Sequence, residues 1–124
     1  MKTAIVILSD PKAGSEEALG RVFNALASAY DFQKNGEEVT VLFQGTGTRW
    51  IAELTKAKHP AHELFNAVKD NVKGVSCGCA AVFGATDDAT NAGFDLIKNN
   101  VIPGTSGLPS LLELAASDHQ VMIF

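Results

Sequence analysis

Two continuous apolar runs constrain the fold of this chain more than any other feature of its sequence. Residues 3–9 and 39–43 are dominated by Val, Ile, Leu and other apolar side chains, with many β-branched residues. Strands of this kind are buried on both faces, as in the centre of a parallel sheet, whereas half-exposed strands alternate apolar with polar residues. The runs therefore predict a sheet that is covered by helices on both faces.

Helical segments alternate with these strands along the chain. From Ser15 onwards, apolar residues recur at three- and four-residue spacing until Asn35-Gly36 ends the pattern. The same reasoning predicts further helices over residues 49–54, from Pro60 to Val72, and over 87–92 and 109–117. It predicts further strands before Cys77 and over residues 94–97 and 120–124, and loops over 44–48 and 103–104. This alternation predicts one domain over residues 1–124, with a mainly parallel α/β sheet of about five strands in the flavodoxin-like style.

Bulk composition restricts the possible partners. The 124 residues are 46% hydrophobic and 19% charged, which is typical of one globular domain with its own core. The net charge of −4 and the scattered lysines argue against a nucleic-acid or anionic-membrane partner. We expect no secretory signal, because the first apolar run is only of strand length, and no window approaches the roughly 18 apolar residues of a membrane span. Because two cysteines one residue apart make a poor structural disulfide, we expect a reducing, cytoplasmic location.

The two cysteines form the most reactive motif in the chain. Cys77 and Cys79 lie where an apolar stretch gives way to small residues that can open a helix. A thiol at the start of a helix faces unpaired backbone N–H groups and the positive end of the helix dipole, both of which favour the reactive thiolate. The alternative is that both are small, buried, apolar side chains, as free cysteines often are.

The expected fold places further polar residues near these thiols. Ligands of open α/β sheets bind at the carboxyl ends of the strands, near the point where the strand order reverses. Asp10 and Lys12 follow the first strand and would orient a ligand there, unless they form an ordinary solvated pair. Thr46 and Thr48, with Gly45 and Gly47, would present hydroxyl and N–H groups to an anion, unless the segment is simply a flexible loop.

Cofactor motifs are missing from the sequence. Neither the phosphate-binding loop of nucleotide hydrolases nor the glycine-rich dinucleotide fingerprint is present, and the first turn lacks the hydroxyl-rich pattern with which flavodoxins hold a flavin phosphate. The Cys-x-Cys pair supplies only two metal ligands, and the three histidines lie in other segments. We therefore expect no cofactor and no metal site.

Several motifs along the chain carry a family resemblance. The run Cys79-Ala-Ala-Val-Phe-Gly84, preceded by Val75-Ser-Cys77 and followed by Gln120-Val-Met-Ile-Phe124, resembles the DsrE/DsrF-like (YchN-like) family. The similarity extends over the opening strand, the first helix and the Gly107-Leu-Pro-Ser-Leu111 segment, and so spans the chain. It implies a small α/β domain that forms homotrimers or homohexamers. Some members pass persulfide sulfur along a relay, using a cysteine in the loop after the third strand.

The cysteine spacing differs from that of many relatives. They carry two cysteines separated by two residues, or one about eight residues before the glycine that is Gly84 here, a count that falls on Ser76. Cys77 takes that place if the loop is one residue shorter, and Cys79 keeps the register of the second thiol.

The resemblance and the thiols together predict a sulfur-relay protein, a possible sulfurtransferase or persulfide carrier. Cys77 and Cys79 would carry the chemistry, with sulfur donor and acceptor proteins as partners and with Asp10, Lys12 and Thr46 as neighbours. One alternative is a non-catalytic oligomeric or small-ligand-binding module of the same fold. Another is a dithiol redox or metal-binding protein.

Overall fold

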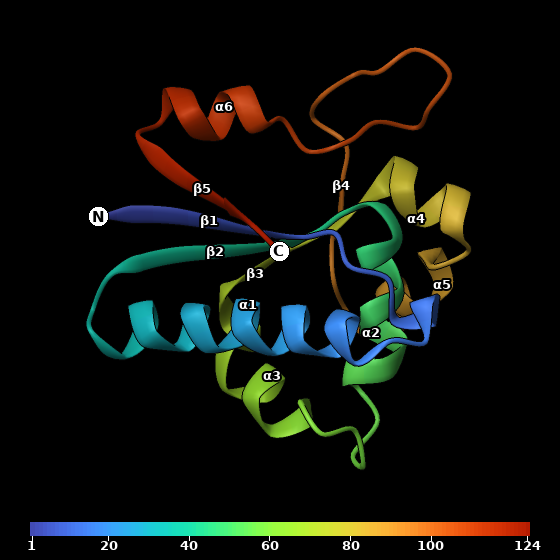
Figure 1. Cartoon of the computed structure of the whole chain (residues 1–124). Helices are drawn as coiled ribbons and strands as arrows, with labels where there is room; N and C mark the ends of the chain where they lie inside the picture. The colour runs from blue at the N-terminus through green and yellow to red at the C-terminus, as the bar shows by residue number, and fades with distance from the viewer.

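Five parallel strands form a single sheet in the computed structural model, which describes the whole chain, residues 1–124 (Figure 1). The strands are β1 (Lys2–Ile7), β2 (Glu38–Phe43), β3 (Val72–Ser76), β4 (Leu96–Ile97) and β5 (His119–Ile123). Their order across the sheet is β4-β3-β2-β1-β5, and every neighbouring pair is parallel. The predicted parallel α/β architecture is confirmed.

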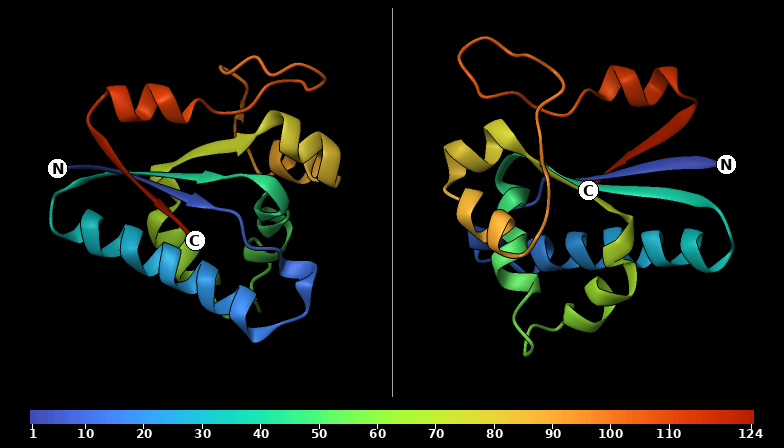
Figure 2. Two further views of the ribbon diagram at one scale, coloured as in Figure 1. Left: turned by 45° about the horizontal axis from the view of Figure 1, so that its top comes forward. Right: turned by 180° about the vertical axis from the view of Figure 1, so that it is seen from behind.

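Helices cover the two faces of the sheet unequally. The α-helices are α1 (Glu16–Lys34), α2 (Trp50–Leu54), α3 (His62–Val68), α4 (Cys77–Phe83), α5 (Thr86–Asn91) and α6 (Leu111–Ala116). Short 3-10 helices are η1 (Pro11–Ala13), η2 (Gly45–Arg49) and η3 (Lys69–Asn71). One face is covered by α1 and α3 and the other by α6, while α4 and α5 stand beyond the carboxyl ends of the strands (Figures 1 and 2). None of the helices combines the length and the apolar character that crossing a membrane would need.

The hydrophobic core follows this asymmetry. The main cluster of 20 buried residues lies on the α1 face, where Val22, Leu26 and Phe65 meet alternate side chains of the strands. On the α6 face, only Ala4, Leu42 and Leu114 form a second buried cluster. The long α1 is stabilised at its start by Ser15, whose hydroxyl accepts a hydrogen bond from Ala18 N, and it ends before Asn35-Gly36 as predicted.

Two expectations about local structure are wrong. Residues 44–48 do not form a loop, because η2 begins at Gly45 and leads directly into α2. Only glycine fits at position 47, where a Cβ atom would lie 2.1 Å from the carbonyl oxygen of Ile7. The helix expected from Pro60 to Val72 is shorter, since α3 spans His62–Val68 and Val72 already belongs to β3. Val72 can contribute to the core from a helix or from a strand, so the apolar periodicity alone did not locate the boundary between α3 and β3.

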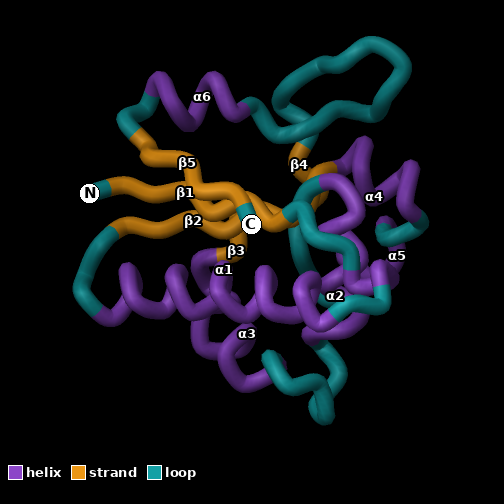
Figure 3. The backbone as a smooth tube through the Cα atoms, viewed as in Figure 1, coloured by secondary structure: helices purple, strands orange, loops and turns teal.

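A long connection between β4 and α6 rises above α4 (Figure 3). We call residues 98–110 the strap. It contains no helix or strand, but Asn100 and Leu108 exchange two backbone hydrogen bonds of 2.8 and 3.0 Å, which close its base. The strap brings residues far along the chain close to the start of α4.

Candidate functional site

The strand-to-helix junction that holds the cysteines is formed as predicted. β3 ends at Ser76 and α4 begins at Cys77. Ser76 is fully buried, and its hydroxyl accepts a hydrogen bond of 3.4 Å from Cys79 N, which caps the helix. The residue count that placed the family's sulfur-bearing position on Ser76 therefore falls on a buried cap, and Cys77 is the first residue beyond it.

Cys77 lies against the strap. Its side chain is half-buried, and its Sγ is 3.3 Å from Oγ of Ser106. Next to it, Gly78 N donates a hydrogen bond of 2.7 Å to the carbonyl oxygen of Gly107. Consecutive residues of α4 are therefore matched with consecutive residues of the strap. The approach is so close that a Cβ atom on Gly78 would lie 3.0 Å from the Gly107 oxygen.

Two N–H groups in the first turn of α4, which we expected to be unpaired, have partners. Gly78 N is bonded to Gly107, and Cys79 N is bonded to Ser76. The sequence placed the thiols at a helix start but did not show that a segment some 30 residues later folds back over it. The hydroxyl of Ser106, rather than an open helix end, is the polar group that reaches the Cys77 sulfur.

Cys79 is also a free, half-buried thiol. It lies two residues after Cys77 on the same helix, which separates the two side chains by about 200° around the helix axis. A disulfide between them would require the first turn of α4 to unwind, because the two Cβ vectors point apart. No group of three or more His, Cys, Asp or Glu side chains lies close enough together to hold a metal ion.

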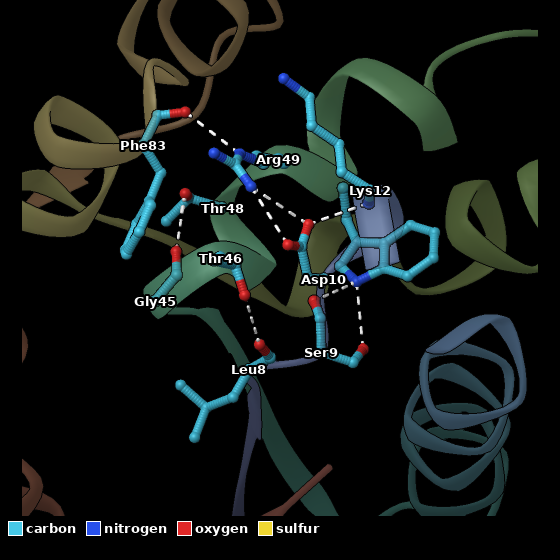
Figure 4. Close-up of polar contacts among 10 residues, drawn as sticks. Leu8, Ser9, Asp10, Lys12, Gly45, Thr46, Thr48, Arg49 and Phe83 are labelled. Carbon is cyan, nitrogen blue, oxygen red and sulfur yellow. Dashed lines mark hydrogen bonds and ion pairs between the residues drawn. The ribbon is translucent and has the colours of Figure 1, made fainter. Parts of the chain in front are cut away.

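Asp10 is held by Arg49 at the same edge of the sheet (Figure 4). The Nη1 atom of Arg49 lies 3.3 and 3.1 Å from the two carboxylate oxygens. The backbone N–H of Lys12 donates to the same carboxylate at 2.9 Å, while the Lys12 side chain extends away from it (Figure 4). The structure thus brings Asp10 and Lys12 together, but Lys12 contributes its backbone.

Arg49 connects this pair to α4. Its Nε donates a hydrogen bond of 3.2 Å to the carbonyl oxygen of Phe83, and its guanidinium lies 5.3 Å from the centre of the Phe83 ring. Phe83 is the last residue of α4, roughly 9 Å along the helix axis from Cys77 at a rise of 1.5 Å per residue. Asp10 and Arg49 therefore anchor the end of α4 that is far from Cys77. Arg49 was not predicted as a site residue, because nothing in the sequence relates it to Asp10.

Thr46 and the glycines around it are used inside the fold. The Thr46 hydroxyl donates to the carbonyl oxygen of Leu8 at 3.0 Å, and the Thr48 hydroxyl donates to Gly45 O at 2.9 Å (Figure 4). Gly47 N donates to Gln44 O at 2.9 Å. Next to this segment, Trp50 is a core residue, 3% exposed, whose Nε1 donates to Ser9 O at 2.7 Å. These contacts hold η2 against the end of β1.

The strand order reverses between β1 and β5, which places the topological switch point two strands away from the cysteines. A groove of about 360 Å³ opens there. It is lined by Leu8, Ser9, Asp10, Ala13, Ser15, Glu17, Ala18, Arg21, Ile123 and Phe124. The predicted loops after β1, β2 and β3 do share one edge of the sheet, but this groove and the thiols occupy different parts of it.

The sequence profile of the DsrE/DsrF-like family matches residues 1–124, the whole chain. The match includes the β3–α4 junction with both cysteines, and the strap. No curated protein sequence matches the chain.

Proposed function

The chain belongs to the DsrE/DsrF-like family, which is known for sulfur relay, and on this premise we propose that it accepts and donates persulfide sulfur on Cys77. The observation that carries the proposal is the position of Cys77. It is a free, half-buried thiol at the carboxyl end of β3, with a hydroxyl group within hydrogen-bond distance of its sulfur. Cys79 is the second thiol of the site.

The proposed reaction is a transfer of sulfane sulfur between thiols. The Cys77 thiolate attacks the outer sulfur of a donor persulfide, and a new S–S bond forms as the donor S–S bond breaks. The electron pair leaves on the donor sulfur as a thiolate, so Cys77 becomes a persulfide and no further oxidant is consumed. An acceptor thiolate then attacks the outer sulfur of this persulfide and regenerates Cys77.

This chemistry needs thiols that stay reduced, and we propose a cytoplasmic location for it. Both cysteines are free, and their positions on one helical turn oppose a disulfide between them. The same geometry counts against the dithiol redox alternative.

We also propose that the chain forms a homotrimer or homohexamer, the assemblies that the family resemblance implies. The α6 face of the sheet supports the idea, because it buries little apolar area within one chain. Leu112 on α6 is 79% exposed and Ile123 on β5 is 58% exposed. Apolar side chains exposed in this way are typical of interfaces between subunits.

Small-ligand binding is the second candidate function. It is favoured by the groove at the switch point between β1 and β5, which combines apolar Leu8 and Ile123 with polar Asp10 and Arg21. In this alternative the groove holds a ligand without covalent chemistry, and the thiols are structural.

Mass spectrometry tests the sulfur-relay proposal. We predict that incubation of the reduced protein with a cysteine desulfurase and cysteine adds about 32 Da, the mass of one sulfur atom, to Cys77. Cys79→Ser should still gain this mass, whereas Cys77→Ser should not. Protein that is alkylated beforehand serves as the control and should gain nothing.

Two results would contradict the proposal. If neither thiol gains the sulfur, or if only Cys79 does, Cys77 is not the acceptor. In the first case, the binding alternative takes its place.

A further inference from the structure

We propose that Ser106 is a functional residue of the sulfur-transfer site, which donates a hydrogen bond to the Cys77 thiolate and sets its reactivity. This inference rests on the proposed function of Cys77. The two side chains belong to different elements, since Cys77 opens α4 and Ser106 lies in the strap. The separation of 3.3 Å between Sγ and Oγ is a hydrogen-bond distance for sulfur.

The direction of this hydrogen bond follows from the charge on sulfur. A thiolate has no proton and can only accept, so the Ser106 hydroxyl has to donate when Cys77 is in its reactive form. Hydrogen bonds to a charged partner are stronger than those between neutral groups. The contact therefore stabilises the thiolate more than it stabilises the thiol.

Ser106 is held in place by its neighbours in the strap. The Thr105 hydroxyl donates to Ile102 O at 2.9 Å and accepts from Gly107 N at 3.1 Å, while Gly107 O accepts from Gly78 N of α4. Gly107 has a φ of +103°, and a Cβ atom there would lie 2.7 Å from both Cβ and O of Lys98. The strap therefore presents Ser106 to the sulfur only while position 107 is glycine.

A reacting partner can reach this contact from solvent. An open groove of about 470 Å³ separates the outer side of α4 from the tip of the strap. Its lining consists of Gly78, Ala81, Val82, Gly104, Thr105 and Ser106. Ser106 lines this groove, and Cys77, which it contacts, is itself only half-buried.

Donation to the thiolate has two opposite effects on rate. It stabilises the thiolate relative to the thiol, and it lowers the nucleophilicity of each thiolate, because part of the charge is held by the hydrogen bond. Loss of the hydroxyl should therefore slow the reaction of Cys77 near neutral pH, where formation of the thiolate limits the rate. It should accelerate the reaction at high pH, where only the nucleophilicity of the thiolate matters.

The experiment measures alkylation of Cys77 by iodoacetamide in the Cys79→Ser protein, at pH 7 and at pH 10. For Ser106→Ala we expect a rate roughly twofold to fourfold lower at pH 7 and at least about twofold higher at pH 10, from the strength of a hydrogen bond to a charged group and the dependence of nucleophilicity on basicity. Ser106→Thr retains the hydroxyl and should restore the original profile. A change in access alone would shift both rates in the same direction.

Two glycines at positive φ provide a matched pair of variants. Gly107→Ala forces residue 107 away from Lys98 within the strap and should reproduce the crossed profile, and adding Ser106→Ala to it should change nothing further. Gly93→Ala, outside the strap and the groove, also places alanine at a positive φ, of +84°, but its Cβ meets no atom within 4 Å. We expect this control to behave like the parent protein.

The outcomes separate this inference from the proposed function. Rates that change in the same direction at both pH values, or not at all, would overturn the role of Ser106 even if Cys77 takes up sulfur from the desulfurase. A crossed profile without any persulfide on Cys77 would support the Ser106 contact and overturn the sulfur relay. A crossed profile together with a persulfide supports both.

Discussion

Among single residues, His59 has the clearest link between environment and protonation. Its Nδ1 accepts a hydrogen bond of 3.1 Å from Ala61 N, and its ring lies edge-on to Trp50 with 6.0 Å between ring centres. Burial lowers the pKa of His59 below its ordinary value of 6.5. The negative charge of Glu53 raises this pKa, whereas electrostatic interactions with Lys56 and His62 lower it further. Protonation of Nδ1 would also remove the acceptor that Ala61 N uses.

We therefore predict that His59 makes the protein less stable at mildly acidic pH. The pKa of His59 is lower in the folded than in the unfolded state, so the unfolded state takes up the proton first as the pH falls. The contribution of neutral His59 to the free energy of unfolding is therefore complete above about pH 6.5, and it is lost as the pH falls below that value. His59→Asn keeps a polar atom near Nδ1 but does not titrate. In urea unfolding between pH 7.5 and 5.5, the wild-type protein should lose more free energy of unfolding than this variant. Parallel curves would show that His59 is not the group responsible.

At the scale of elements, Arg49 connects three parts of the fold. It belongs to η2, pairs with Asp10 after β1, and donates to the last carbonyl group of α4. The side chains of Arg49 and Asp10 are only 24% and 27% exposed, so solvent screens the pair less than it screens pairs at the surface. The planar guanidinium reaches both partners at once, which an ammonium group would not do.

Arg49→Lys should accordingly destabilise the protein by about 1–3 kcal/mol, the range for loss of hydrogen bonds to charged groups. Equilibrium unfolding in urea provides the measurement. Arg21→Lys is the matched control, because Arg21 pairs with Glu17 on the exposed side of α1, where both side chains are more than half exposed. We expect a change below about 0.5 kcal/mol for the control. Equal effects of the two substitutions would mean that Arg49 acts as an ordinary surface arginine.

The whole molecule has one well-covered face and one sparsely covered face. α1 and α3 enclose the main core, whereas α6 is the only helix on the other side of the sheet and buries only Leu114 there (Figures 1 and 2). β5 is an edge strand with Ile123 exposed. This asymmetry is the physical basis for our proposal that identical chains associate through α6 and β5.

Leu112→Glu should therefore disrupt self-association, because a charge would have to be buried at the interface. We predict that sedimentation at micromolar concentration shows a trimer or hexamer for the wild-type protein and a much smaller species for this variant. Tyr30→Glu, on α1 at the opposite face, is the control and should sediment like the wild type. A wild-type protein that sediments as a single chain would contradict the proposed assembly.

The sequence by itself determined the main local elements of this protein. Continuous apolar runs identified β1 and β2, helical periodicity with Ser15 and Asn35-Gly36 delimited α1, and the change from apolar to small residues located the β3–α4 junction with its cysteines. These features could be predicted because the burial of a segment and its capping residues depend on residues that are close together in the sequence. The family resemblance came from the same local motifs.

Only the tertiary structure decided which distant segments meet. The placement of β5 beside β1, the ion pair between Asp10 and Arg49 across 39 residues, and the contact between Cys77 and Ser106 across 29 residues all depend on packing over long sequence separations. Apolar periodicity predicts that a residue is buried, but it does not predict which residue packs against it. The sequence around a polar residue in a turn likewise does not indicate its hydrogen-bond partner. For this reason the thiols were visible in the sequence, whereas the hydroxyl that contacts one of them was not.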